Sequence, residues 1–334
     1  MQYTRFVRRS LLVLGMAVSC LAQSSPDIRV DVDLVRVAVS VIDRAGKPVQ
    51  DLRQEEFTLL DNGKTRPIQY MWKEADIPLT VGLIVDVSGS QMKHFGEHQQ
   101  TMAQFLKQVL RPQDQAFLVT VAGDVRLVTD LTPSVGQLQA GVDSLARRPA
   151  PGTALGEPCP PPSRQSIPRF PIPGRFPRWG CGGPSVLWHA VYTAAKLKMK
   201  PVDGRKAMIL VTDGLDTGSI HTLTDAIEAS QSAETLVYTI RYAALPALAA
   251  PGLAFRGRRG LRRLSEETGG RAYAAPQEGP AGIFTQIEAE LRNLYVLGFA
   301  VPETARDGKV HMLEVKSKRK GVTVRARKSY TPTR

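Results

Sequence analysis

Hydrophobic and polar residues follow two different rhythms along this chain of 334 residues. Residues 28–42 alternate between apolar and polar side chains, which is the pattern of a half-buried β-strand. A turn at D-R-A-G-K-P-V is followed by F-T-L-L-D-N-G-K, in which Asn62-Gly63 is a strong signal for a β-hairpin. We therefore predict a β segment over residues 27–76, which is too small to bury an adequate core alone.

From Pro78 onward, short apolar runs alternate with stretches of helical period. We predict strands at 80–87, 116–122, 125–130, 206–212 and 236–242. We predict helices at 94–110, 134–147, 186–199, 223–234, 259–269 and 281–294. This alternation is typical of the α/β class, with a doubly wound, mostly parallel sheet flanked by helices. The runs K-A-M-I-L-V-T and L-V-Y-T-I are apolar throughout, as expected of strands buried on both faces.

The alternating period returns after Asn293, in three short segments of a C-terminal β segment, residues 295–334. Three strands are too few to fold comfortably alone. The economical inference is that the N- and C-terminal β segments form one small β-sandwich, with the α/β domain of residues 78–294 inserted between them.

Residues 149–184 fit neither rhythm and contain 11 of the 24 prolines. We interpret them as an insertion into the α/β domain, because a long segment without secondary structure is unusual in a compact domain. Cys159 and Cys181 are predicted to form a disulfide, which would contribute on the order of 3 kcal/mol by closing the loop. Two interpretations of this insertion remain open: it is a recognition element, or it is an addition without a function.

The first 22 residues have the features of an export signal. Arg5, Arg8 and Arg9 precede a short apolar core, and C-L-A at 20–22 is a cleavage site of small residues before Gln23. Lipid attachment at Cys20 is the alternative. We expect the protein to be exported, either to the periplasm or into the medium.

The formal net charge of +13 is concentrated toward the C-terminus, where residues 306–334 hold ten Lys or Arg against Asp307 and Glu314. Export makes nucleic acid an unsuitable partner. Two readings remain open: the solvated outer faces of a strand pair, or contact with an anionic surface such as envelope lipid or polysaccharide.

Oxygen-bearing side chains follow two of the predicted strands. Asp86, Ser88 and Ser90 come directly after one strand, and Thr212 and Asp213 end another. In a doubly wound sheet the carboxyl ends of parallel strands form the ligand-binding edge, so these side chains should converge. Carboxylates and hydroxyls are ligands for Mg²⁺. Two aspartates only neutralise a dication, so such a site would still attract an acidic ligand.

The motif D-V-S-G-S (86–90), followed by V-T-D-G (211–214), resembles the metal-ion-dependent adhesion site of von Willebrand factor type A domains. The resemblance covers roughly residues 78–294. It implies that Asp86, Ser88, Ser90 and Asp213 bind Mg²⁺, with Mn²⁺ or Ca²⁺ as alternatives. It also implies a protein or envelope partner that presents a carboxylate. Flanking pieces such as E-L-R-N-L-Y-V-L-G-F resemble exported bacterial proteins with this domain that are abundant in Acidobacteria.

The middle element of this motif departs from the family pattern. Relatives typically have G-G-T-A-L-Y-D-A, whereas this chain has G-G-P-S-V-L-W-H-A, in which Ser185 would replace the threonine ligand. The alternative ligand is Thr153 in P-G-T-A-L. A helical pattern follows Ser185 and favours it. His94, His98 and His189 fall on predicted helices and are expected to be surface or capping residues.

We consider three hypotheses for the function of this protein. The first is a metal-dependent binding module rather than an enzyme. The second is a hydrolase that uses Ser88, Ser90 or Mg²⁺, but the chain has no G-x-S-x-G elbow and no phosphate-binding glycine motif after a strand. The third is an envelope scaffold whose metal site has degenerated, which the altered middle element keeps open.

Overall fold

The computed structural model describes residues 34–73, 77–88, 95–145, 185–216, 218–242, 251–275 and 281–332. The predicted signal segment, Cys20, Ser90, Thr153, Cys159 and Cys181 lie outside these residues. Among the described residues, no helix is both long and apolar enough to cross a membrane.

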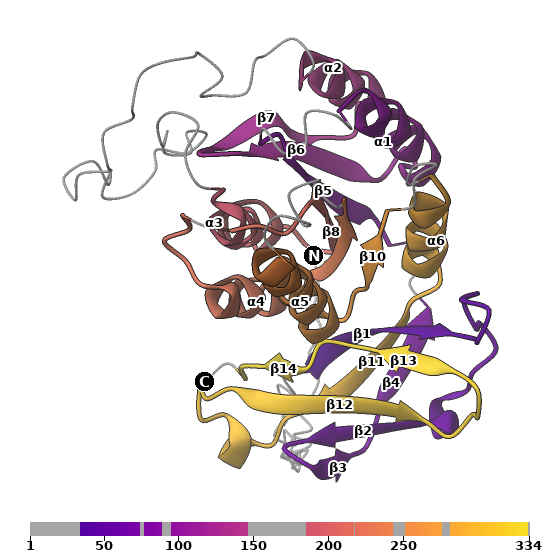
Figure 1. The fold of residues 1–334 in the computed structure, drawn as a ribbon. Helices are drawn as coiled ribbons and strands as arrows, with labels where there is room; N and C mark the ends of the chain where they lie inside the picture. The colour runs from indigo at the N-terminus through magenta and orange to yellow at the C-terminus, as the bar shows by residue number, and fades with distance from the viewer. Residues whose placement is uncertain are drawn as a thin grey trace, which may run out of the picture. The chain divides into compact units, whose positions relative to one another are not determined.

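Six strands of the described residues form an α/β sheet (Figure 1). Its strands are β5 (Leu79–Asp86), β6 (Gln115–Val121), β7 (Val125–Thr132), β8 (Arg205–Thr212), β9 (Leu236–Arg241) and β10 (Ala272–Ala274). Within the described ranges the strand order is β10-β9-β8-β5-β6-β7, and only the β6–β7 pair is antiparallel. β5 and β8 therefore lie side by side at the centre of the sheet and run in the same direction.

Helices cover both faces of this sheet (Figure 1). They are α1 (Phe95–Val109), α2 (Val135–Leu145), α3 (Leu187–Ala194), α4 (Leu223–Ser232), α5 (Pro251–Thr268) and α6 (Ala281–Arg292), and α3 continues as a π-helical turn over Ala195–Met199. α1, α2 and α6 contribute to one apolar cluster, whereas α3, α4 and α5 contribute to another.

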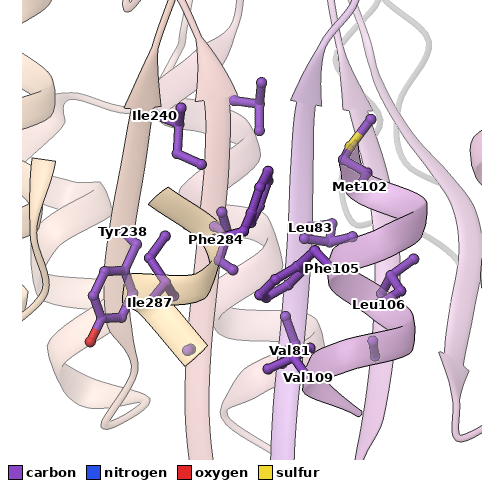
Figure 2. Close-up of a cluster of buried hydrophobic side chains, with 14 of the residues drawn as sticks. Val81, Leu83, Met102, Phe105, Leu106, Val109, Tyr238, Ile240, Phe284 and Ile287 are labelled. Atoms are coloured by element: carbon purple, nitrogen blue, oxygen red, sulfur yellow. The ribbon is translucent and has the colours of Figure 1, made fainter. Parts of the chain in front are cut away.

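The two clusters meet the sheet through alternate residues of its strands. Figure 2 shows Leu83 of β5 against Phe105 of α1 and Phe284 of α6, all within the first cluster. The rings of Phe105 and Phe284 are 4.6 Å apart. Ile84, the next residue along β5, belongs to the cluster on the other face. β5 is thus buried on both sides, which is why its sequence shows no alternation.

Strands from both ends of the chain form a β-sandwich. They are β1 (Leu34–Ile42), β2 (Phe57–Asp61), β3 (Lys64–Arg66), β4 (Tyr70–Lys73), β11 (Tyr295–Ala300), β12 (His311–Ser317), β13 (Thr323–Arg325) and β14 (Ser329–Tyr330). In the described part of the chain they make two four-stranded sheets, ordered β13-β1-β11-β4 and β14-β12-β2-β3. Two short 3₁₀ turns accompany them, at Gln54–Glu56 and Glu303–Ala305. These sheets and the α/β layers belong to one compact unit, Asp33–Arg334.

The core of the sandwich forms between strands that are far apart in sequence. β1 pairs with β11 and β12 pairs with β2, so each sheet combines strands from the two ends of the chain. Leu59, Leu297 and Phe299 are fully buried between the sheets. Neither end segment has enough apolar residues to form this core by itself. The observed pairing of strands from the two ends confirms the predicted fold class, including its sandwich.

Two elements of the α/β domain differ from the sequence-based expectation. Helix α5 begins at Pro251, eight residues before the predicted start at 259. Its first turns contain Gly252 and Gly257, which lower helix propensity and hid the helix. The short strand β10 was not predicted at all, because three residues are too few to show a period.

The basic C-terminal segment is less available for an outside partner than its composition suggested. Arg319 pairs with Asp51 and Glu56, and Arg325 lies 3.6 Å from Glu290. Arg327 is buried. Contact of this segment with an anionic surface stays a prediction, carried by exposed lysines such as Lys318, Lys320 and Lys328.

Candidate metal site

Two polar residues end the central strands at the same edge of the sheet. Asp86 is the last residue of β5 and Thr212 the last of β8, and the parallel register pairs Val85 with Val211 just before them. The Thr212 hydroxyl donates a hydrogen bond of 2.7 Å to Oδ2 of Asp86. The same hydroxyl accepts the N–H of Gly214 at 3.0 Å. Thr212 therefore fixes the orientation of Asp86 and the turn that follows β8.

The carboxylate of Asp86 is almost completely buried, with 1% of the residue exposed. Burial raises its pKa to about 6, and the negative charge of Asp213 acts in the same direction. Hydrogen bonds from the Ser88 side chain, from Thr212 and from the Ser88 N–H oppose this rise. Within the described residues, no Lys, Arg or His forms an ion pair with Asp86. A bound cation would offset the cost of burying this charge.

Asp213 lies in a tight turn that α5 covers. It is 6% exposed, and its Oδ1 accepts the N–H of Leu215 at 2.9 Å. The next residue, Gly214, has a φ of +85°, which favours glycine. A Cβ atom on Gly257 of α5 would lie only 2.9 Å from the Gly214 carbonyl oxygen. The two glycines thus let α5 contact the backbone of the Asp213 turn directly.

Ser185 reaches the same edge from a third segment. The N–H of Val186 donates to Ala122, which follows Val121, the residue paired with Asp86 in the sheet. The carbonyl of Ser185 accepts the N–H of Gly218, beyond the Asp213 turn. The Ser185 hydroxyl oxygen is buried and has no hydrogen-bond partner among the described residues. A buried hydroxyl without a partner costs free energy, so this oxygen is available to a ligand.

The loop after β8 also positions the helix that follows Ser185. Oδ1 of Asp216 accepts the N–H of Trp188 at 3.2 Å and the Ser219 hydroxyl. Asp216 therefore caps the N-terminus of α3 from a distant part of the sequence. Sequence reasoning missed this residue, because the helix that it caps lies 28 positions earlier in the chain.

The donor set suits a hard divalent cation. No group of three or more His, Cys, Asp or Glu able to hold a metal occurs in the described part of the chain, so a site here needs hydroxyl ligands. Asp86, Ser88, Asp213 and Ser185 offer oxygen atoms only, which fits Mg²⁺, Mn²⁺ or Ca²⁺. The partnerless Ser185 oxygen and the un-neutralised Asp86 carboxylate both fit such an ion. Ser90 and the alternative ligand Thr153 lie outside the described residues.

The prediction for one histidine of α3 was wrong. His189 is 7% exposed and is not a surface residue. Its Nδ1 lies 2.8 Å from Nδ1 of His221, so one ring donates a hydrogen bond and the other accepts it. Burial lowers the pKa of His189 to about 4, and His221 adds to the effect. The apolar residues around it in L-W-H-A-V-Y turn this side of α3 toward the core.

Comparison with known proteins adds weak similarities. No family model and no curated protein matches the sequence. Solved structures with similarity to this chain include the following three. An aerotolerance-related membrane protein from Bacteroides fragilis has 13% identity and a TM-score of 0.43, covering 64% of this chain and 98% of that one. The vWF domain of the type V pili tip protein Mfa5 from Porphyromonas gingivalis has 12% identity and a TM-score of 0.44, covering 64% and 94%. Proximal thread matrix protein 1 from the mussel byssus, with a zinc-occupied MIDAS motif, has 11% identity and a TM-score of 0.46, covering 69% and 49%.

At these identities, and with TM-scores below 0.5, the similarities decide neither ligand nor partner. The fold class follows from the strand order, from the helices on both faces of the sheet and from the two polar strand ends. Together they define an α/β domain with a doubly wound, mostly parallel sheet, which belongs to one compact unit with the β-sandwich.

Proposed function

We propose that this protein is a binding module that holds a divalent cation at the edge of its central sheet and uses it to dock an acidic group of a partner. The observation that carries the proposal is the buried pair of carboxylates, Asp86 and Asp213, at neighbouring strand ends. Both residues are largely removed from water, and the charge of Asp213 adds to the rise in the pKa of Asp86, so a bound cation would lower the cost of keeping Asp86 ionised.

The residues have distinct roles in this proposal. Asp86, Ser88 and Asp213 hold the ion, together with Ser185 and, from the same loop as Ser88, Ser90. Thr212 does not bind the ion but orients Asp86 through its hydrogen bond. When bound, the cation supplies a Lewis-acidic centre that attracts a carboxylate oxygen from outside.

The surface beside the site favours an acidic partner. Arg256, Arg258 and Arg259 lie on the first turns of α5 and are exposed. None of them forms an ion pair with another described residue. Gly257, in the middle of this group, contacts the Asp213 turn. A partner with several acidic residues would meet the cation and these arginines together, and opposite charges accelerate association.

We also propose the cellular setting that the sequence indicates. Export through the N-terminal signal places the domain at the envelope or in the medium, where Cys159 and Cys181 can oxidise to a disulfide. The insertion that they close adjoins Ser185 in the sequence. It is thereby placed to contribute to the choice of partner.

The test is binding of a fluorescent peptide rich in Asp and Glu, followed by anisotropy. We expect binding in Mg²⁺, loss of binding after chelation with EDTA, and no binding by Asp213→Ala. Equal binding with and without the metal would contradict docking through the cation. No binding of metal or peptide would leave the scaffold function. Turnover of simple esters or phosphate esters that needs Ser88 would instead establish a hydrolase.

A further inference from the structure

A pocket of about 50 Å³ opens at the beginning of β8, whereas the candidate metal site lies at its end. Lys206, near the start of β8, lines it, together with Arg36 of β1 and Arg327, which follows β13. The seven steps along β8 separate the two ends of the strand by roughly 23 Å. The pocket is therefore independent of the candidate metal site.

The charges around the pocket are unbalanced. Of the described residues, four cations line it, Arg36, Arg205, Lys206 and Arg327, against a single carboxylate, Glu234. Glu234 lies 3.3 Å from Arg36 and 3.5 Å from Arg327, so it is shared by two guanidinium groups. An arrangement with this excess of positive charge attracts a negatively charged ligand.

Arg327 is the best placed of these cations. It is 9% exposed, and its two terminal nitrogens donate to the carbonyls of Gln231 and Arg36 at 3.1 and 2.8 Å. Its Nε is buried and has no hydrogen-bond partner in the described structure. A buried donor of a charged group without a partner costs more free energy than a neutral one. Arg327 lines the pocket, so an anion bound there would lie beside this guanidinium group.

Lys206 adds a second buried charge. It is 8% exposed, and its Nζ donates to the Val202 carbonyl at 2.9 Å. Burial lowers the pKa of Lys206, and Arg36 and Arg327 act in the same direction against Glu234 and Asp203. An ammonium group has three donors, and the described structure gives a partner for one of them.

The uncharged part of the lining includes polar Gln231, Thr235 and Thr268, and its apolar side chains include Leu236, Leu291 and Leu294. A water molecule occupies about 10–15 Å³ by the same measure, so the pocket suits a ligand of a few heavy atoms. We propose that this pocket binds a small organic anion, whose charged oxygens contact Arg327 Nε and Lys206 Nζ and whose apolar part packs on the leucines. Charge-assisted hydrogen bonds from buried donors give the affinity, and the leucines select against purely inorganic ions.

The experiment is a calorimetric and thermal-shift titration of the full chain with butyrate, butylammonium or inorganic phosphate, at constant ionic strength. EDTA is present throughout, so the outcome does not depend on the metal site. We expect saturable binding of butyrate, no binding of butylammonium, and weaker binding of phosphate. Tighter binding of phosphate than of butyrate would overturn the apolar part of the assignment.

The matched variants are Lys206→Met, which keeps the length of the side chain, and Arg36→Met at the half-exposed rim. Each should weaken butyrate binding, and Lys206→Met should do so by about tenfold or more. Lys320→Met, which removes an exposed lysine outside the pocket, should leave the Kd unchanged. Equal Kd values for wild type and both pocket variants, or equal binding of butyrate and butylammonium, would overturn the proposal.

Discussion

The hydroxyl of Thr212 donates a 2.7 Å hydrogen bond to the buried carboxylate of Asp86 across two neighbouring parallel strands. Because both strands end at this edge, the bond connects the loop after β5 to the loop after β8. The Asp86 carboxylate is also held by the N–H of Ser88. The candidate metal site is therefore partly ordered by the protein itself.

Replacing Thr212 with Val, which has a similar shape, tests this relationship. Thr212→Val removes the donor to Oδ2 of Asp86 and leaves the Gly214 N–H without its acceptor, so we expect a loss of about 1–3 kcal/mol in the free energy of unfolding. Urea unfolding without metal measures it. Thr58→Val, in β2, has no hydrogen bond to lose among the described residues and should stay within about 0.5 kcal/mol of wild type. Equal stability of both variants would contradict the role of Thr212.

Ser185→Ala tests whether Ser185 is a metal ligand or a structural residue. The buried Ser185 oxygen has no partner in the described structure, so its removal should leave stability without metal unchanged or slightly higher. The same change should weaken Mg²⁺ binding. Ser230→Ala is the control, because that buried hydroxyl donates to Ala226 and lies on α4, so Mg²⁺ affinity should not change. Wild-type Mg²⁺ affinity in Ser185→Ala would leave Thr153 as the candidate for the middle ligand.

Gly257→Ala tests the contact of α5 with the Asp213 turn. The new Cβ would lie 2.9 Å from the Gly214 oxygen and 3.3 Å from the Asp213 oxygen, which are backbone atoms that cannot rotate away. We expect a loss of about 1–3 kcal/mol and weaker metal binding. Gly252→Ala on the same helix meets no atom within 4 Å and should be neutral or slightly stabilising. Two variants of equal stability would show that the close approach is not needed.

The buried His189 predicts a pH dependence. Its folded pKa of about 4 lies below the ordinary 6.5, so the unfolded chain binds the additional proton as the pH falls below 6.5. Stability should therefore be complete above pH 6.5 and decrease toward pH 4, by about 1–2 kcal/mol at about pH 5 after allowing for solvent screening. His189→Gln should remove this part of the decrease in urea unfolding. An identical pH profile for both proteins would contradict the assignment.

The sequence predicted the parts of the fold that depend on local pattern. Continuous apolar runs identified β5 and β8, and the polar residues after them located Asp86 and Asp213 at one edge. The sandwich was predicted because neither end segment could form a core alone. These predictions required only periodicity and the general rule that parallel strands end together.

Other features depend on contacts that no local pattern shows. The hydrogen bond from Thr212 to Asp86 depends on strand register, and the capping of α3 by Asp216 joins residues of separate loops. The early start of α5 was hidden by Gly252 and Gly257, and of these Gly257 serves the close packing of α5 on the Asp213 turn. The pocket near Lys206 combines residues of β1, β8 and the segment after β13, so it could not be seen before the strands were assembled.

The most direct measurement is an isothermal titration of Mg²⁺ into the wild-type protein and into Asp213→Ala, with circular dichroism to show that both are folded. A buried pair of aspartates that needs a cation predicts one saturable site in the wild type and at least about tenfold weaker binding in the variant, because a charged ligand group is lost. Wild-type protein that binds no Mg²⁺, Mn²⁺ or Ca²⁺, or a variant that binds Mg²⁺ as tightly as wild type, would contradict the proposed metal site.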